Sequence, residues 1–180
     1  MKPLSLKARA IALLAQREHS RSELQRKLLR IARQQDEKER QARREVGVNA
    51  EAADVEPGDD DGEPTSVNHA EAVETLLDWL QAHRYLSEAR FVESRINARA
   101  HRYGNLRIRQ ELSQHGVAPD AASQQTLKDS ELDRARQVWQ RKFGELAAEP
   151  AARAKQMRFL AGRGFSPEVI RKVVRGAEDE

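Results

Sequence analysis

Positively charged side chains recur at helical spacing in three separate parts of the chain. Arg95, Arg99 and Arg102 follow one another at i, i+4 and i+7, which places them along one face of a single helix. One such run is usually a solvated helix face. Three runs on repeated units predict an extended basic track that suits a polyanion or an acidic protein groove. The candidate set is Arg26, Lys27, Arg30, Arg95, Arg99, Arg102, Arg107, Arg109, Arg153, Lys155, Arg158, Arg171 and Lys172.

Signals of enzymatic chemistry are absent from the sequence. It contains no phosphate-binding loop, no glycine-rich dinucleotide motif, no H-E-x-x-H and no G-x-S-x-G. The five histidines are scattered, with no i, i+4 pair backed by carboxylates, and acidic pairs such as Asp129 with Glu131 suit helix N-terminal dipoles better than catalysis. We therefore expect no enzyme, no metal site and no cofactor.

The chain lacks Cys, which excludes disulfides and thiolate metal sites and suits a reducing compartment. Apolar residues near its start are interrupted by Arg and Lys, and nowhere do eighteen apolar residues follow one another. We expect a soluble, cytoplasmic protein with no signal peptide and no membrane partner.

An acidic segment lies between two basic parts of the chain. From Gln34 to His69, eleven acidic and four basic residues give −7, which leaves about +10 elsewhere because the whole chain carries +3. Its second half, with PGDDDGEP, holds too few large apolar residues to offset chain entropy and predicts disorder. Its first half, DEKERQARRE, can prolong the preceding helix for a few turns. Two interpretations stay open: a solvated loop, or a mimic of nucleic acid that folds back onto the basic face.

Elsewhere the apolar residues recur every three or four positions, which predicts helices throughout and no convincing strand. Ser20 with Glu23 forms a capping box at one helix start, and Ser87 begins another helix, which Gly104 ends. A further helix ends at Gly116. The aromatic residues expected to pack between helices, with base stacking as the alternative, are Trp79, Trp139, Phe91, Phe143 and Phe159.

Two turns of the chain share one pattern. HGVAPDAA and RGFSPEVI both read basic, Gly, apolar, small, Pro, acidic, at a separation of forty-eight residues. Leu112 and Leu160 each precede a turn glycine, Gly116 or Gly164, by four residues. In the first round Leu28 holds the equivalent place, and the acidic segment accounts for the 36 additional residues. The recurrence predicts three copies of one three-helix unit.

We therefore expect an all-α protein of three tandem three-helix repeats in an elongated, curved array. Each unit of under fifty residues has a small core, so neighbouring units must bury faces against each other. The expected boundaries are 1–86 for the first repeat, interrupted by a disordered acidic insertion at about 34–69, then 87–128 for the second, 129–176 for the third and 177–180 for an acidic tail.

A long central block, LLDWLQAHRYLSEARFVESRINARAHRYGNLRIRQELSQHGVAP, resembles the bacterial RecX family. The segments SRSELQRKLL and RFLAGRGFSPEVIRKVV are similar to its flanking units, so the resemblance covers everything except the insertion. It implies three tandem three-helix repeats that lie in the groove of the RecA filament on DNA and limit filament growth, ATPase activity and strand exchange. In two respects the chain departs from the family: Ser87 stands where Asp is common, and the insertion is longer than the usual connector.

The resemblance implies a negative regulator of the RecA recombinase in DNA recombination, DNA repair and the SOS response. Its expected partners are the RecA filament and single- or double-stranded DNA, which the monomeric protein alone binds weakly. With about five phosphates neutralised, affinity for single strands falls with salt at a log–log slope of about −3.5. The alternative is an autonomous helical DNA- or RNA-binding module of helix-turn-helix type, which would read a duplex without RecA.

Overall fold

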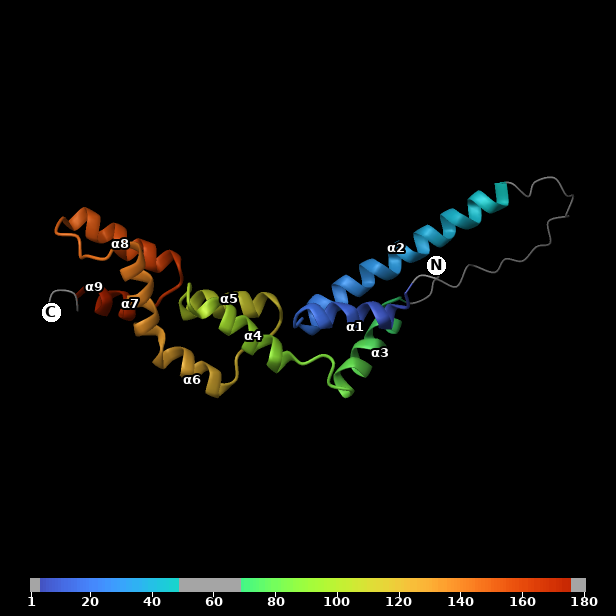
Figure 1. Ribbon diagram of the computed structural model, residues 1–180, viewed down its shortest axis with the longest axis horizontal. Helices are drawn as coiled ribbons and strands as arrows, with labels where there is room; N and C mark the ends of the chain where they lie inside the picture. The colour runs from blue at the N-terminus through green and yellow to red at the C-terminus, as the bar shows by residue number, and fades with distance from the viewer. Residues whose placement is uncertain (1–3, 49–68, 176–180) are drawn as a thin grey trace, which may run out of the picture. The chain divides into compact units, whose positions relative to one another are not determined.

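The computed structural model describes residues 4–48 and 69–175, and within these ranges the chain forms nine α-helices and no strand (Figure 1). The helices are α1 (Leu6–Gln16), α2 (Arg21–Val48), α3 (His69–Ala82), α4 (Glu88–Ala100), α5 (Asn105–Gln114), α6 (Ala121–Asp129), α7 (Glu131–Lys142), α8 (Pro150–Gly162) and α9 (Pro167–Arg175). The all-α class and the grouping by threes are confirmed. The chain divides into two compact units. The first is Met1–Ser87 and contains α1–α3, and the second is Glu88–Glu180 and contains α4–α9.

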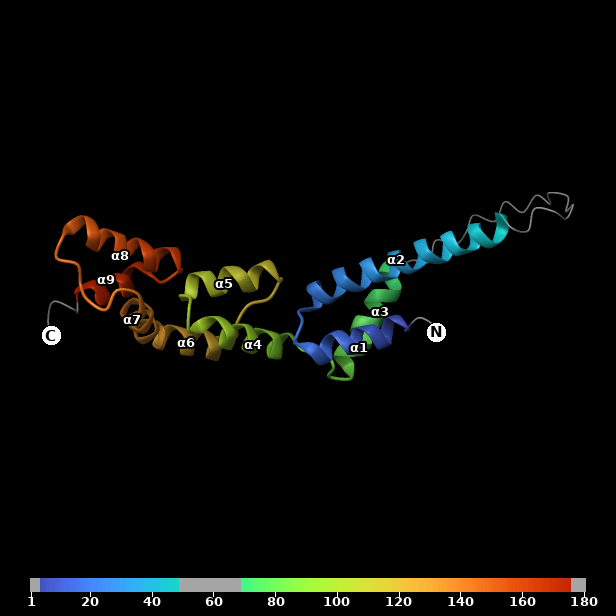
Figure 2. The same cartoon turned by 45° about the horizontal axis from the view of Figure 1, so that its top comes forward.

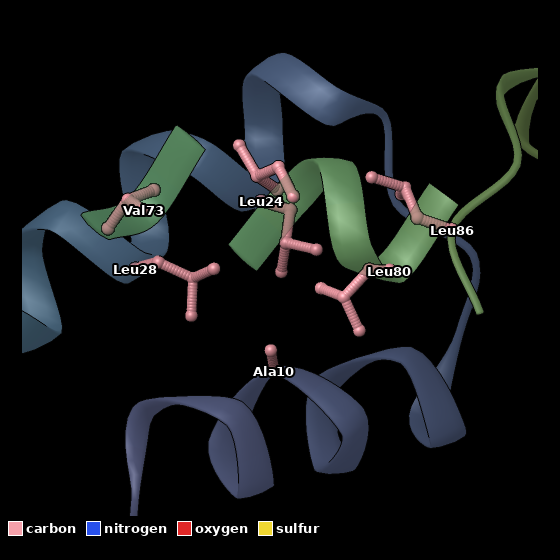
Figure 3. Close-up of a cluster of buried hydrophobic side chains, with 7 residues drawn as sticks. Ala10, Leu24, Leu28, Val73, Leu80 and Leu86 are labelled. Carbon is pink, nitrogen blue, oxygen red and sulfur yellow. The ribbon is translucent and has the colours of Figure 1, made fainter. Parts of the chain in front are cut away.

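The first unit is built around a leucine-rich core that its three helices share. Ala10 of α1, Leu24 and Leu28 of α2 and Leu80 of α3 are fully buried, and Figure 3 shows these side chains gathered between the three ribbons. Leu24 and Leu28 are one helical turn apart and therefore lie on the same face of α2. The predicted apolar stripe is the stripe that the core buries.

Ser20 caps α2 as predicted, because its hydroxyl accepts a hydrogen bond from the backbone N–H of Glu23 at 3.1 Å. The carboxylate of Glu23, expected to reach back to the cap, pairs instead with Arg17, and with Lys27 at 3.6 Å. Burial raises the pKa of Glu23, but the hydrogen bond and charge of Arg17 outweigh burial and lower the pKa to about 2. The ionised side chain thus ties the α1–α2 linker to α2.

Helix α2 continues past the point where α3 contacts it. His69, the first residue of α3, lies with Nε2 2.6 Å from Oδ2 of Asp36, and residues 37–42 beyond this contact are exposed. Figure 1 shows this end of α2 extending past α1 and α3. The first half of the acidic segment is therefore helical through Val48, as predicted. The predicted disorder and fold-back at 49–68, and the acidic tail at 177–180, lie outside the described residues.

In the second unit, α4 and α5 lie side by side (Figure 2), and α6 completes the second repeat. Phe91, Ile108, Leu112 and Leu127 are buried in the core of this repeat. Helix α4 ends at Ala100, before the predicted stop at residue 104. Gly104 is instead the N-cap residue of α5, in an extended conformation.

The third repeat packs α7 against both α8 and α9. Trp139 is buried there, and its indole N–H donates to the side-chain oxygen of Gln156 at 3.3 Å. Phe143 and Phe159 meet edge to face, with ring centroids 5.2 Å apart. These aromatic residues pack between helices, as predicted.

The two turns that share a sequence pattern also share a backbone geometry. Gly116 and Gly164 have φ of +74° and +79°, the left-handed region in which a glycine commonly ends a helix. The residue after each glycine then bonds to the buried leucine that precedes the turn. These hydrogen bonds run from the Val117 N–H to the Leu112 carbonyl at 3.2 Å and from the Phe165 N–H to the Leu160 carbonyl at 3.3 Å. The repeated sequence pattern therefore corresponds to a repeated turn conformation.

The register differs after the turns. Pro167 begins α9, as predicted for a first-turn proline, but Pro119 precedes the N-cap of α6. The cap is Asp120, whose carboxylate accepts from the Ser123 N–H at 2.7 Å. A short acidic side chain is a strong N-cap, and α6 therefore starts two residues later than the repeat predicts.

Candidate functional site

A buried carboxylate joins the second and third repeats within the second unit. Glu131, the first residue of α7, has 4% of its surface exposed. One of its oxygens accepts from the Asn105 N–H at 2.9 Å and from the Ser166 N–H at 3.3 Å, and the other accepts from the Ser166 hydroxyl at 3.1 Å. Glu131 therefore satisfies amides at the starts of α5 and α9, where helix dipoles favour negative charge. Glu131 does lie in the first turn of α7, as expected for a charge at a helix N-terminus, but its burial and its bonds to the starts of α5 and α9 were not predicted.

Arg134 closes the same junction from the next turn of α7. Its guanidinium binds the ends of α4 and α6, which satisfies carbonyls that a helix C-terminus leaves unpaired. The acceptors are the carbonyls of Ala100 at 3.1 Å, Tyr103 at 2.8 Å and Leu127 at 2.9 Å, and the side-chain oxygen of Asn105 at 2.6 Å. Burial lowers the pKa of Arg134, and the charge of Glu131 opposes this shift. Arg134 is thus a structural cation.

The backbones of the two repeats also meet directly. The N–H of Gly104 donates to the carbonyl of Arg163 at 2.9 Å, and the N–H of Leu106 donates to that of Gly164 at 3.0 Å. A Cβ at position 104 would lie 2.3 Å from the Gly164 carbonyl oxygen, and a Cβ at position 164 would lie 2.6 Å from the Arg107 backbone nitrogen. The two backbone segments are therefore too close at this point for a side chain at either glycine.

This junction brings arginines from both repeats around one tyrosine ring. The guanidinium carbon of Arg107 lies 4.7 Å from the Tyr103 ring centroid, and those of Arg99 and Arg163 lie 6.0 Å from it. Arg163 also donates to the carbonyl of Arg102 at 3.2 Å. We call Arg99, Arg107 and Arg163 the Tyr103 cluster; Arg102 adjoins it through its backbone carbonyl. A planar guanidinium group that lies on an aromatic ring still directs N–H groups outward. Two of these N–H groups can donate parallel hydrogen bonds to one phosphate.

One carboxylate moderates the charge beside this cluster. Glu111 of α5 lies 3.3 Å from a guanidinium nitrogen of Arg95 and 3.0 Å from one of Arg99. These pairs fasten α4 to α5, so Arg95 and Arg99 have structural roles in addition to any binding role. The prediction that Arg102 continues their helix face was wrong, because α4 ends at Ala100 and Arg102 lies in the turn. The side chains of Arg102 and Arg107 are exposed.

Two further predicted residues, Arg109 and Lys172, line a cleft of about 800 Å³ between α5, α6, α7 and α9. Lys128 lines the same cleft. Lys172 pairs with Glu168 at 3.0 Å, and this hydrogen bond and charge lower the pKa of Glu168. The cleft therefore has cations and a paired acid at its rim, and Glu131 in its lining.

The remaining candidates of the third repeat lie on α8 and α9. Lys155, Arg158 and Arg171 are exposed. Arg153 is half-buried, and its Nε donates to the Ala147 carbonyl at 3.3 Å. Arg153 thus helps to hold the loop before α8 and is less available to a ligand than its neighbours.

In the first unit, Arg26 and Arg30 are exposed one turn apart on α2. Lys27, on the same helix, faces the buried His19. Its Nζ lies 2.9 Å from Nε2 of His19, which is 1% exposed. Nδ1 of His19 donates to the Arg17 carbonyl at 2.9 Å. Burial lowers the pKa of His19 and so favours the neutral ring, whose Nε2 accepts a hydrogen bond from Lys27. Lys27 of α2 therefore has a structural role, because it holds His19 of the α1–α2 linker.

Among the described residues, no group of three or more His, Asp or Glu side chains is placed to hold a metal ion. In the same ranges, 4–48 and 69–175, no helix is long and apolar enough to cross a membrane.

Sequence reasoning did not predict the junction contacts of Glu131 and Arg134, and it left Arg163 out of the candidate set. Arg163 had a usable signal, because it directly precedes the repeated turn glycine, as His115 does in the second repeat. For Glu131 and Arg134 the only signal was a charged pair at i, i+3 inside an otherwise ordinary amphipathic helix. Such a pair is common on solvated helices and does not reveal a buried junction.

Fold and surfaces together define an all-α protein of tandem three-helix repeats that present arginine side chains. Residues 87–124 match the model of the second three-helix domain of RecX, and residues 129–174 match that of the third. Three similar proteins are each named "Regulatory protein RecX". The protein of Ralstonia nicotianae is 40% identical, with 98% of this chain and 90% of the relative covered. Those of Herminiimonas arsenicoxydans and Pseudomonas entomophila are 42% and 38% identical, with 98% of this chain and 95% and 94% of the relatives covered.

The chain therefore belongs to the RecX family of regulatory proteins. This result confirms the resemblance drawn from the central block and its two flanking segments. The relatives are named as regulators, in agreement with the lack of catalytic motifs in the sequence.

Proposed function

We propose that this protein binds the RecA filament on DNA and limits its growth, its ATPase activity and strand exchange. The observation that carries the proposal is the Tyr103 cluster, in which three arginines from two repeats lie around one ring and Glu111 pairs with one of them, Arg99. Guanidinium groups gathered in this way attract a polyanion more strongly than a mixed-charge surface does. In the filament, the phosphates of DNA, or an acidic surface of RecA, would be a ligand of this kind.

Each unit contributes its own cations to this proposed activity. Arg26 and Arg30 are exposed on α2 of the first unit, and Arg102 and Arg107 are exposed in the second. Because both units belong to one chain, attachment by one raises the effective concentration of the other at the filament. Two weak surfaces then bind a repetitive polymer more tightly than either surface binds alone. This mechanism is consistent with the expectation that the protein alone binds DNA weakly.

Strand exchange by RecA tests the proposal with Arg102→Ala/Arg107→Ala. Both side chains are exposed, so this variant removes charge while it keeps the Arg95 and Arg99 pairs with Glu111. We expect the wild type to inhibit strand exchange and the variant to need several times more protein for the same inhibition. Arg136→Ala/Arg141→Ala is the matched control, because it removes two exposed arginines of α7 that lie outside the candidate set. The control should inhibit as the wild type does.

Two outcomes contradict the proposal. If the wild type leaves strand exchange unaffected, the protein does not act on RecA in this way. If the wild type instead binds a duplex of particular sequence in the absence of RecA, the helix-turn-helix module is the better description.

A further inference from the structure

Three aromatic rings and one ammonium group gather at the end of α3 in the first unit. The Trp79 and His83 rings are stacked, with centroids 4.0 Å apart and planes 23° apart. The Tyr85 ring lies nearly parallel to Trp79, with centroids 5.7 Å apart and planes 17° apart. Nζ of Lys7 lies 3.3 Å from the Trp79 centroid. We call Trp79, His83 and Tyr85 the aromatic column.

Local contacts hold the column in place. Nδ1 of His83 donates to the Trp79 carbonyl at 2.8 Å, which fixes the imidazole against the helix. The N–H groups of Tyr85 and Leu86 both donate to the Leu80 carbonyl, at 2.9 and 3.1 Å, and Leu86 is buried in the core. Between His83 and Tyr85, Arg84 has φ of +60°, an unusual value for a residue other than glycine. A turn fixed from both sides presents its side chains in one orientation, and strained residues of this kind concentrate at functional sites.

The outer rings of the column are not part of the core. Tyr85 is 45% exposed and His83 is exposed, whereas Trp79 packs partly against the leucine-rich core. Trp139 gives the contrast, because it is 6% exposed and its N–H is bonded to Gln156. Trp79 therefore anchors the column, and the Tyr85 and His83 rings extend it into solvent.

We propose that the aromatic column is a stacking platform for an unpaired base of single-stranded nucleic acid. Every nucleobase has a flat π-face that continues a column of parallel rings, and binding of this kind tolerates any sequence. Lys7 places a cation beside the same rings, where the sugar-phosphate backbone of a stacked strand carries its charge. This inference deepens the proposed function and rests on it for the source of the strand, the DNA within the filament. The chemistry of the platform does not depend on RecA.

Anisotropy of a labelled oligonucleotide tests the platform with the full-length protein and without RecA. The two probes are oligothymidylate of twenty nucleotides and an abasic oligonucleotide of equal length and charge. We expect the wild type to bind the probe with bases about tenfold more tightly than the abasic probe. Tyr85→Ala should lose most of this difference and leave binding of the abasic probe unchanged. Tyr85→Phe keeps the ring and removes only the hydroxyl, so it should behave as the wild type does.

Equal affinity of the wild type for the two probes, or binding of neither at low salt, would overturn the inference. So would an unchanged preference for bases in Tyr85→Ala. If Tyr85→Ala binds both probes normally but loses affinity for RecA without DNA, the column is a protein-docking site and the inference is wrong. Failure of the proposed function is a separate result, because a wild type that stacks bases but leaves strand exchange unaffected keeps the platform and loses RecA as its target.

Discussion

Gly104 and Gly164 lie backbone against backbone, so close that a Cβ at position 104 would be 2.3 Å from the carbonyl oxygen of Gly164. Residues sixty positions apart thereby join the second repeat to the third. The same approach places Arg163 of the third repeat beside Tyr103 of the second. The position of these arginines is thus a consequence of backbone packing.

Replacement of Gly104 by Ala should destabilise the second unit by about 2 kcal/mol or more, because the added Cβ meets backbone atoms, which cannot rotate away. Gly162→Ala is the matched control. A Cβ at position 162, at the end of α8, has no neighbour within 4 Å, and alanine there should stabilise the helix by about 0.5–1 kcal/mol. Urea unfolding of the full chain measures both. Equal stability of the two variants would contradict the described junction.

Glu131→Ala should lower the free energy of unfolding by about 3 kcal/mol, since it removes the acceptor of two backbone amides and a hydroxyl and a negative charge that acts on Arg134. Asp133→Ala changes another acidic residue in the first turn of α7, but its side chain is 74% exposed. We expect that control to change stability by less than about 0.5 kcal/mol. A small effect at both positions would show that the buried carboxylate does not hold the repeats together.

Glu111→Gln should increase binding of single-stranded DNA, because it removes the carboxylate that pairs with Arg95 and Arg99. The gain should be about two- to fivefold at low ionic strength and smaller at high salt, where screening weakens the effect of one charge. The unfolding free energy should fall by about 1 kcal/mol, since both pairs are partly exposed. Oligonucleotide anisotropy at two salt concentrations gives the affinities. Weaker binding by this variant would separate Arg95 and Arg99 from the binding surface.

Acid should destabilise the first unit in two stages. The folded protein lowers the pKa of His19 below 6.5, so the unfolded chain takes up this proton more readily and stability falls as the pH drops below 6.5. The pKa of Glu23 is lowered from 4.5 to about 2, so a further contribution of about 2 kcal/mol, present above pH 4.5, is lost between pH 4.5 and 2.

Urea unfolding at a series of pH values checks this order, with His19→Asn as the comparison. Asn keeps a donor for the Arg17 carbonyl but does not titrate. This variant should be less stable at pH 7 and should show almost no loss between pH 6.5 and 5. An equal loss in the wild type and the variant over that range would assign the first stage to another group.

The sequence was sufficient for features that depend on near neighbours. The turns at Gly116 and Gly164, the Ser20 cap and the leucine stripe of α2 each need only residues within about one helical turn. Long-range contacts decided the rest. The predicted stop at Gly104 was wrong because α4 ends where Arg134, more than thirty residues later, binds the Ala100 and Tyr103 carbonyls. That earlier end moved Arg102 off the expected helix face.

The candidate cations divide in the same way. The basic runs in the sequence identified Arg26, Arg30, Arg102 and Arg107, which are exposed. Spacing alone did not separate them from Lys27, which faces buried His19, because a salt-bridged lysine and a free one have the same sequence signal. Tertiary partners therefore decide which members of a basic run remain available to a ligand.

Hydrolysis of ATP by RecA on single-stranded DNA tests the central claim most directly. The account predicts that increasing amounts of the wild-type protein lower the steady-state rate. Arg102→Ala/Arg107→Ala should need several times more protein for half-maximal inhibition, and Arg136→Ala/Arg141→Ala should match the wild type. A rate that stays constant at every concentration of the wild-type protein, under conditions where RecA is fully assembled on the DNA, would contradict the account.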